Sequence, residues 1–344
     1  MDQKLNFSCD YLRGAHPAIL QRLAETNMMK TAGYGFDPFS ESAREKIRKA
    51  CGCAGAAVEF LAGGTQTNAV MIDAFLRSWQ GVVAAQTGHI ATHEAGAIEA
   101  SGHKVLTLPH ELGKIRTEDL RQYLQDFRAD ANHDHMVMPG MVYISQPTEY
   151  GILYSRGELE ALHQICREYE IPLYLDGARL AYALACPEND ADLPDLAAYC
   201  DAFYIGGTKC GALFGEAVVI PEPERLPALF TIIKQHGALL AKGRIAGIQF
   251  DVLFSDGLYG KLGTAAVAAA DRLRKLLRDK GYQFLFETVS NQIFCVVENA
   301  QLEKLGEKLD YSFWEKYDEK HTVIRLATDW ATTAEEVDEL AEIL

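Results

Sequence analysis

The stretch Ala202-Phe-Tyr-Ile-Gly-Gly-Thr-Lys209-Cys-Gly-Ala212 places a lysine directly after a hydrophobic, strand-like run and among small residues. Glycines let a backbone approach a bulky ligand closely. A lysine in such surroundings can be desolvated, which lowers its pKa and frees the amine to form a Schiff base. The alternative is a surface lysine in a hairpin turn, and this motif alone favours neither interpretation.

Short apolar runs that resemble strands alternate with helix-like stretches on both sides of this lysine. The runs span residues 57–61, 82–85, 105–108, 141–145, 173–175, 202–205 and 217–220. Such alternation predicts an α/β protein with a mostly parallel central sheet flanked by helices. Only a glycine-rich loop separates the last two runs, so we expect them to be neighbouring strands.

The pattern differs at the two ends of the chain. The first 35 residues are polar and predict an arm with one short helix. A long helical region is expected from Pro221 to about residue 242, followed by a helix at about 259–280, strand-like runs at 292–297 and 322–327, and a terminal helix that starts at a Thr333–Glu336 capping box. We therefore expect the arm and a large domain over residues 1–244, and a smaller α+β domain over residues 245–344.

A second candidate site follows the run at 173–175, where the sequence reads Asp176-Gly-Ala-Arg179. Open α/β sheets bind ligands at the carboxyl ends of their strands. Pyridoxal phosphate needs a carboxylate beside its ring nitrogen, and Asp176 is placed for that role. The alternative is an aspartate that only caps the next helix.

The segment Gly63-Gly64-Thr65-Gln66 lies between a strand-like run and an expected helix. Free N–H groups at a helix start, with a threonine hydroxyl, form a phosphate site. The segment is not a P-loop, because no Gly-Lys-Ser/Thr follows it. It is not a dinucleotide fingerprint either, because the G-x-G-x-x-G spacing is absent. Alone, it does not identify a ligand.

Two further side chains occupy positions that suit a cofactor or its substrate. His89 follows the run at 82–85, where an imidazole can stack on an aromatic cofactor; the alternative is a ring that is hydrogen-bonded within the fold. Arg325 lies inside an apolar run, and a buried arginine needs an anionic partner. That partner is either a carboxylate of the protein or a substrate carboxylate held by the guanidinium fork.

Together and in this order, these segments resemble the threonine aldolase group of the fold type I pyridoxal-phosphate enzymes, in the aspartate aminotransferase superfamily. The resemblance covers nearly the whole chain. Near the start of the chain it is carried by Phe7-Ser-Cys-Asp10, Gly14-Ala-His16-Pro17 and Tyr34-Gly-Phe-Asp37-Pro38. Further along it is carried by Lys209 and the segments 60–68, 88–94, 176–179 and 325–330. The fold of that superfamily is the expected one.

The resemblance implies a pyridoxal 5′-phosphate site. Lys209 would bind the cofactor covalently, Asp176 would pair with the pyridine nitrogen, and His89 would stack on the ring. The phosphate would be held by Gly64, Thr65 and Gln66.

It also implies a small amino acid as substrate. Arg179 and Arg325 would bind its carboxylate. Family members carry serine where this chain has Cys9, and because cysteine is the poorer hydrogen-bond partner, Ser8 or a backbone group would take over. Tyr34 would reach the site of a neighbouring subunit, since the family shares its sites across a homodimer or homotetramer.

One family arginine is missing. A Gly-Gly-Gly-Met-Arg-Gln segment normally gives an arginine to the phosphate, but the matching stretch here reads Lys242-Gly-Arg244-Ile-Ala-Gly-Ile-Gln249. Lys242 or Arg244 would compensate.

The implied reaction is cleavage of L-threonine or L-allo-threonine and related β-hydroxy-α-amino acids into glycine and an aldehyde. His89, or a water that it positions, would be the base, with His135 as a less favoured candidate. The same residues would suit another pyridoxal-phosphate lyase that catalyses β-elimination, or a racemase. A non-catalytic ligand-binding protein is disfavoured by the intact set of lysine, aspartate, histidine and arginines.

The composition excludes several other classes. The net charge of −15 over 344 residues argues against nucleic acid and anionic membrane surfaces as partners. No apolar run reaches the roughly 18 residues of a membrane span, and we expect no signal peptide. Eight cysteines are too sparse for a disulfide scaffold, and no metal site is predicted. We expect a cytoplasmic enzyme whose positive pocket is formed by Lys209, Arg179, Arg325 and Lys242.

Overall fold

A computed structural model describes residues 4–344. Its central sheet has seven strands: β2 (Ala57–Leu61), β3 (Gln80–Ala85), β4 (Lys104–Leu108), β5 (Met138–Ser145), β6 (Leu173–Asp176), β7 (Ala202–Gly206) and β8 (Glu216–Ile220). Their order is β2-β8-β7-β6-β5-β3-β4. Strands β3 to β7 are parallel, and β8 is antiparallel to both of its neighbours. The predicted mostly parallel sheet and the adjacent pair β7–β8 are confirmed.

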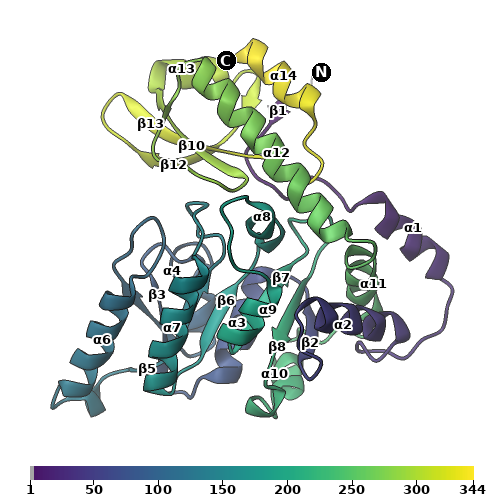
Figure 1. The fold of residues 1–344 in the computed structure, drawn as a ribbon, viewed down its shortest axis with the longest axis vertical. Coiled ribbons are helices and arrows are strands. Elements are labelled where there is room, and N and C mark those ends of the chain that lie inside the picture. The colour runs from purple at the N-terminus through teal and green to yellow at the C-terminus, as the bar shows by residue number, and fades with distance from the viewer. Residues whose placement is uncertain (1–3) are drawn as a thin grey trace.

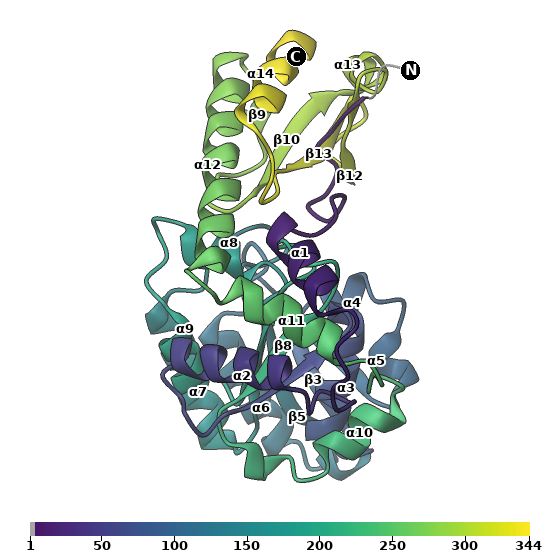
Figure 2. The ribbon, with the colours of Figure 1, turned by 90° about the vertical axis from the view of Figure 1, so that its right-hand side faces the viewer.

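Helices cover both faces of this sheet (Figures 1 and 2). They are α2 (Pro38–Ala50), α3 (Gly64–Phe75), α4 (His89–Thr92), α5 (Ala97–Ala100), α6 (Thr117–Ala129), α7 (Arg156–Tyr169), α8 (Leu180–Ala185), α9 (Leu193–Tyr199), α10 (Leu229–Gln235) and α11 (Arg244–Leu253). Single 3-10 turns lie at His133–His135 and Pro223–Arg225.

Two apolar cores form because successive strand residues point to opposite faces of the sheet. Val82 and Tyr143 face the core that contains α3 and α10. Val83 and Val142 face the core that contains α6, α7 and α9. Both faces are buried, which is why these strands read as nearly continuous apolar runs.

A second sheet lies above the first in Figure 1. Its strands are β9 (Gln283–Phe284), β10 (Gln292–Glu298), β12 (Ser312–Lys316) and β13 (His321–Ala327), paired antiparallel in the order β12-β13-β10-β9. It packs with α12 (Leu258–Asp279), α13 (Asn299–Leu305) and α14 (Ala334–Ile343). The predicted capping box is present, since Thr333 and Glu336 exchange hydrogen bonds at the start of α14.

The N-terminal arm joins the two sheets. Strand β1 (Leu5–Asn6) pairs with β11 (Leu309–Asp310), and the Phe7 carbonyl accepts a hydrogen bond from Ala327 of β13. Helix α1 (Pro17–Thr26) is the one short helix that was predicted, and His16 before it donates to Gly211, two residues beyond Lys209. Residues 7–16 therefore run from the small sheet to the lysine loop.

The long helix expected from Pro221 to about residue 242 is wrong. The region contains only the turn Pro223–Arg225 and the seven-residue α10. Gly237 follows α10 with a φ of +66°, in the left-handed region that ends helices. A loop then leads to α11.

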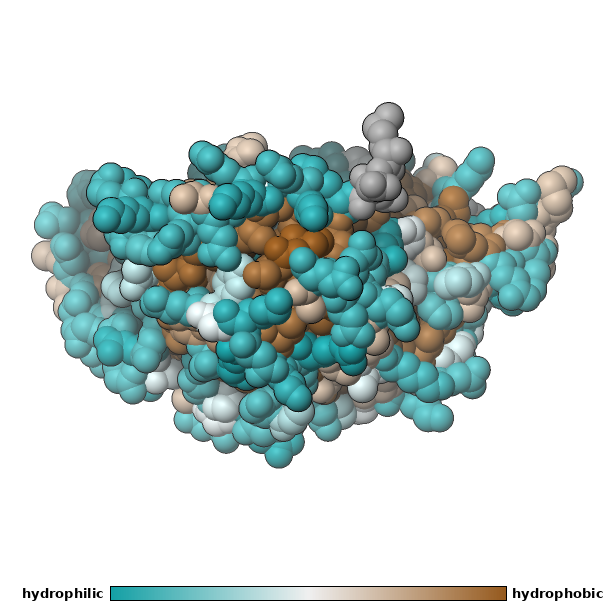
Figure 3. Space-filling model, turned by 90° about the horizontal axis from the view of Figure 1, so that it is seen from above, coloured by the Kyte–Doolittle hydropathy of each residue, from teal (hydrophilic) through white to brown (hydrophobic). Residues whose placement is uncertain are grey.

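The face seen from above in Figure 3 is mostly hydrophilic, with apolar residues gathered near its middle. Among the helices of residues 4–344, none combines the length and the apolar character that crossing a membrane would require.

Candidate active site

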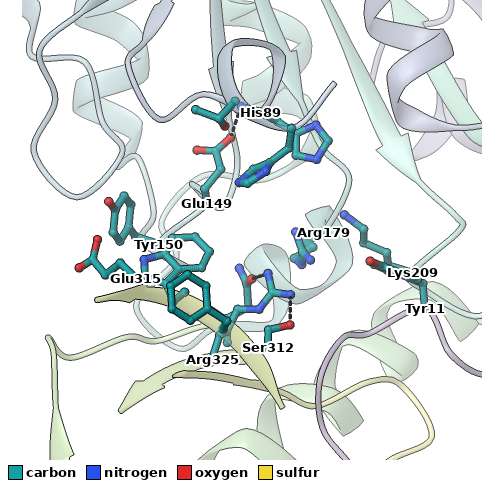
Figure 4. Close-up of a pocket in the computed structure, with 14 residues that line it drawn as sticks. Tyr11, His89, Glu149, Tyr150, Arg179, Lys209, Ser312, Glu315 and Arg325 are labelled. Atoms are coloured by element: carbon teal, nitrogen blue, oxygen red, sulfur yellow. Dashed lines mark hydrogen bonds between the residues drawn. The ribbon is translucent and has the colours of Figure 1, made fainter. Parts of the chain in front are cut away.

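A hollow in two parts lies between the carboxyl ends of the parallel strands and the small sheet, and Figure 4 shows residues that line its outer part. The outer chamber, of about 490 Å³, reaches Arg325, Ser312 and Trp314 of the small sheet. The inner chamber, of about 320 Å³, reaches Asp176, Tyr204, Thr208 and Glu216 of the central sheet and the start of α3. The two chambers share the residues Tyr11, His89, Glu149, Arg179 and Lys209.

Lys209 lies in the loop between β7 and β8 and lines both chambers. Burial lowers the pKa of its amine, and the charge of Arg179 lowers it further, although Asp10 opposes both effects. The Lys209 amine lies 6.0 Å from the centroid of the Tyr11 ring. The structure thus places a partly desolvated amine where the sequence predicted a nucleophile.

The glycines before Lys209 serve the packing of the backbone. A Cβ on Gly206 would lie 2.4 Å from the Ala178 carbonyl oxygen, and one on Gly207 would lie 2.6 Å from that of Gly215. The atoms contacted belong to the backbone of this same protein and not to a ligand site. The expected close approach to a ligand therefore does not explain these glycines. They let the loop that carries Lys209 fold back against β6 and β8.

Asp176 ends β6 and is held by hydrogen bonds. Its Oδ2 accepts from the Tyr143 hydroxyl at 2.7 Å and the Asn68 amide at 3.0 Å, and its Oδ1 accepts from the Tyr204 hydroxyl. Burial alone would raise the pKa of Asp176, but the nearby charge of His89 and these donated hydrogen bonds lower it. The group is therefore an ionised carboxylate facing the inner chamber.

His89 begins α4 after the end of β3, and a buried carboxylate fixes its ring. Its Nδ1 lies 2.7 Å from Oε1 of Glu94, a side chain that is fully buried. The same Oε1 accepts from the Asn68 amide at 2.7 Å, so Asn68 links Glu94 to Asp176. A ring fixed in this way faces both chambers in a single orientation.

Arg325 has neutral hydrogen-bond partners. Its guanidinium donates to Gln292 Oε1 at 3.1 Å, the Ser8 carbonyl at 3.2 Å and Ser312 Oγ at 3.2 Å. Among residues 4–344 no carboxylate lies within 4.0 Å of it. Burial and the charge of Arg179 lower its pKa. The sequence left two alternatives for the partner of Arg325, a carboxylate of the protein or a substrate carboxylate. The described residues contain no salt bridge of the first kind.

Arg179 caps α8 and forms a two-pronged ion pair with Asp10 of the arm, at 2.7 and 3.0 Å. Asp10 also accepts from Asn291 at 2.8 Å. Burial would raise the pKa of Asp10, but Arg179 and Lys209 lower it to about 2. Two donor atoms of Arg179 are thus occupied by the protein, although its side chain lines both chambers.

The arm residues take different positions. The Ser8 hydroxyl donates to Asn6 at 2.7 Å, while its carbonyl accepts from Arg325. Cys9 is half-buried and does not line either chamber. Tyr34 lies outside both chambers of this chain, 43% exposed, with a φ of +59°.

At the expected phosphate site, Gly64 and Thr65 start α3 and line the inner chamber. The Gln66 side chain instead accepts from the Ala62 backbone N–H at 3.1 Å. Glu216 also faces this chamber, where it accepts from Thr208 Oγ1 at 2.6 Å and from the Gly207 N–H. Burial raises the pKa of Glu216 to about 7.

Neither basic residue expected to replace the family arginine lines a chamber. Arg244 donates to the carbonyls of Met29 and Asn27, and so fastens the loop after α1. Lys242 is exposed in the loop before α11. Gln249 is buried and bonds the backbone of the lysine loop at Leu213.

The prediction of one positive pocket is wrong. Lys209, Arg179 and Arg325 do come together, but four carboxyl groups line the chambers with them: Glu149, Asp176, Glu216 and Glu315. Burial raises the pKa of Glu149 and of Glu216, which favours their protonated forms and reduces this negative charge.

The sequence did not predict the residues that donate hydrogen bonds to Asp176 and Asn68. Tyr143, Tyr174 and Tyr204 come from three adjacent strands, and their hydroxyls bond Asp176 or Asn68. A tyrosine inside each of three apolar runs, on the same face of the sheet, was the available signal. Glu149 and Ser312 carried no comparable signal, since each lies outside the motifs.

Comparisons with known proteins agree with this geometry. The family model of beta-eliminating lyases matches residues 6–336. The chain is 30% identical over 315 residues to a low specificity L-threonine aldolase of a Pseudomonas species, across 89% of this chain and 88% of that protein. It is 28% identical over 348 residues to the one of Pseudomonas aeruginosa, across 99% and 97%.

Solved structures give the same picture. The threonine aldolase of Leishmania major matches with a TM-score of 0.95 and 42% identity, over 98% of both chains. An aspartate aminotransferase of Thermus thermophilus matches with a TM-score of 0.72 at 15% identity, over 99% of this chain and 92% of that chain, and shares the fold alone. The chain therefore belongs to the beta-eliminating lyase family and, within the fold type I pyridoxal-phosphate enzymes, to the threonine aldolase group.

Proposed function

We propose that this protein binds pyridoxal 5′-phosphate and cleaves β-hydroxy-α-amino acids of the L-threonine and L-allo-threonine type into glycine and an aldehyde. The observation that carries the proposal is the convergence of Lys209, Asp176, His89 and Arg325 on one hollow. Figure 4 shows how Lys209, His89 and Arg325 lie in it. An amine, a carboxylate, a flat ring and a guanidinium that has no acidic partner among residues 4–344 are the groups that this cofactor and an amino acid require.

The inner chamber fits the cofactor. The ionised Asp176 would keep the ring nitrogen protonated, the Lys209 amine would bind the aldehyde carbon, and His89 would stack on the ring. The phosphate would lie at the start of α3, held by Gly64, Thr65 and the backbone N–H of Gln66, whose side chain is bonded to Ala62. When bound, the protonated ring supplies an electron sink for the carbon–carbon bond that breaks.

The outer chamber would bind the rest of the substrate. Arg325 would hold the carboxylate with its guanidinium, oriented by Ser312 and by the Ser8 carbonyl. Arg179, anchored by Asp10, would add a second positive charge at short range. Fixing the carboxylate sets which bond at Cα stands perpendicular to the ring and therefore which bond breaks.

We also propose the organisation of the whole enzyme. The chain would form a homodimer or homotetramer in which Tyr34 reaches a neighbouring site, with a large domain over residues 1–244 and a small one over 245–344. A small amino acid would be its partner, without nucleic acid or membrane. All eight cysteines lie in the described residues and are free, which supports a reducing, cytoplasmic environment.

The test is an assay of purified protein with L-threonine and L-allo-threonine, with the cofactor added and omitted. Cofactor-dependent release of glycine and acetaldehyde is expected. Ammonia and a keto acid would indicate β-elimination instead, and loss of optical activity would indicate a racemase. Lys209→Ala should lose the absorbance of the covalently bound cofactor, and retained turnover in that variant would refute the role of Lys209.

A further inference from the structure

Glu149 is a carboxyl group inside the site that the roles above leave unused. It follows β5 and lines both chambers, between His89 and Tyr150 (Figure 4). Its Oε1 accepts two hydrogen bonds, from Ser145 Oγ at 2.8 Å and from the His89 backbone N–H at 2.8 Å. Within residues 4–344 its Oε2 accepts none, so one oxygen is anchored and the other remains available to a ligand.

His89 is poorly placed to accept a proton if it stacks on the cofactor. Its Nδ1 lies against the carboxylate of Glu94, which can only accept a hydrogen bond, so Nδ1 carries the ring proton. The remaining lone pair, on Nε2, lies in the plane of the ring. A stacked imidazole presents its face to the cofactor, and this lone pair then points along the cofactor plane.

The surroundings of Glu149 favour proton exchange. Burial raises the pKa of its carboxyl, and the hydrogen bonds that it accepts from the backbone and from Ser145 lower it in part. Of the nearby charges, Asp176 raises this pKa and His89 lowers it, and the net shift is upward. Its charge also acts on the hydroxyls of Tyr143, Tyr150 and Tyr154. The remaining titratable groups that line the outer chamber with it are Tyr11, His93, Arg179, Lys209, Glu315 and Arg325. A carboxyl whose pKa is raised is a stronger base and can accept a proton and then release it again.

We propose that Glu149 is the catalytic base that removes the proton from the β-hydroxyl group of the substrate. The O–H bond breaks and its proton passes to Oε2 of Glu149, a C=O double bond forms at Cβ, and the Cα–Cβ bond breaks with its electron pair left on Cα. The bound cofactor would supply the electron sink for that pair. An aldehyde leaves, Cα takes a proton from water to give glycine, and Glu149 returns to water the proton that it received. The atoms balance without an oxidant, and this inference rests on the aldolase function proposed above.

The experiment compares two reactions in the holoenzyme of Glu149→Gln. One is aldehyde release from L-threonine and L-allo-threonine. The other is exchange of the α-hydrogen of glycine in deuterated water, followed by NMR, which needs the cofactor and Lys209 but has no β-hydroxyl group. Glu149→Gln should lower aldehyde release at least about 100-fold, and should keep both glycine exchange and the cofactor absorbance within about threefold of wild type.

The matched controls are Glu315→Gln, the other glutamate of the outer chamber, and His93→Asn, the second histidine there. Both should keep aldehyde release within about threefold. In wild type, kcat/KM should fall as the pH decreases through the raised pKa of Glu149, and the residual activity of Glu149→Gln should lack this limb.

Aldehyde release by Glu149→Gln near the wild-type rate would overturn the proposal, and so would an equal loss of both reactions, which would indicate a structural role. A larger loss in His93→Asn than in Glu149→Gln would move the base to His93. Wild-type protein that exchanges glycine but releases no aldehyde from any β-hydroxy-α-amino acid would instead refute the proposed aldolase function.

Discussion

Glu94 holds His89 in place: the carboxylate Oε1 lies 2.7 Å from the ring Nδ1, and the Glu94 side chain is completely buried. The same oxygen accepts from Asn68, which also donates to Asp176. His89, expected on the face of the cofactor, and Asp176, expected at its ring nitrogen, are therefore linked through Glu94 and the Asn68 amide. Movement of either would disturb the other.

Glu94→Ala is predicted to lower kcat about tenfold or more, because the His89 ring would lose the partner that fixes its tautomer and orientation. The Asn68 amide would also lose one acceptor, so the affinity for the cofactor should fall as well. Steady-state kinetics and a cofactor titration by absorbance test this. A variant with unchanged kcat and unchanged affinity would show that the contact is not needed.

Arg325→Ala is predicted to raise KM for the amino acid about 10- to 100-fold, the range expected when a charged hydrogen bond is lost. The unfolding temperature should change little, since the partners of Arg325 in the fold are neutral. Arg325→Lys should recover only part of the loss, because an ammonium group cannot form the two-pronged contact. An unchanged KM in Arg325→Ala would place the carboxylate elsewhere.

Asp10→Asn is predicted to destabilise the protein by about 3 to 5 kcal/mol at pH 7, because it leaves the buried Arg179 without its ion-pair partner. The wild-type pair also predicts an acid dependence. The pKa of Asp10 is lowered from 3.8 to about 2, so its contribution is present above pH 3.8 and is lost as the pH falls through about 2.

Chemical denaturation at pH 7 and pH 2.5 measures both effects. The control is Asp338→Asn, which breaks an exposed pair with Arg272 and should cost less than about 1 kcal/mol. An equal change in the two variants would contradict the importance of the buried pair.

The sequence predicted the fold well where strands are buried on both faces. Strands β6, β7 and β8 are buried along their whole length, so their apolar runs stand out from the helices between them. The predicted helix after Pro221 was wrong because helical composition does not reveal where a glycine adopts a positive φ, as Gly237 does. The two-residue pairing of β1 with β11 joins segments 304 residues apart and has no local signal.

The site was predictable to the extent that it lies at strand ends. Lys209, Asp176 and His89 each follow an apolar run, and the structure brings them to one hollow. The pair Arg179–Asp10 was not predicted, because its members lie 169 residues apart and only the folded arm brings them together. The predicted positive pocket was wrong for a related reason, since Glu149 lies in a loop and Glu216 at the start of β8, both outside the motifs.

Glu216→Gln is predicted to stabilise the protein above neutral pH and not below pH 5. Burial raises the pKa of Glu216 from 4.5 to about 7, so the folded state binds this proton more tightly than the unfolded state. In the wild type, the contribution of protonated Glu216 to stability is complete below pH 4.5. It is lost as the pH rises through about 7, where a buried charge must form. Glutamine mimics the protonated carboxyl at every pH.

The melting temperature of the variant relative to wild type should therefore rise between pH 5 and pH 8, by about 3 °C if the difference reaches about 1 kcal/mol. Glu315→Gln changes an exposed carboxyl in the same hollow and should produce no such trend. A constant difference across this pH range would mean that Glu216 keeps one protonation state between pH 5 and pH 8, and it would contradict the raised pKa on which this prediction rests.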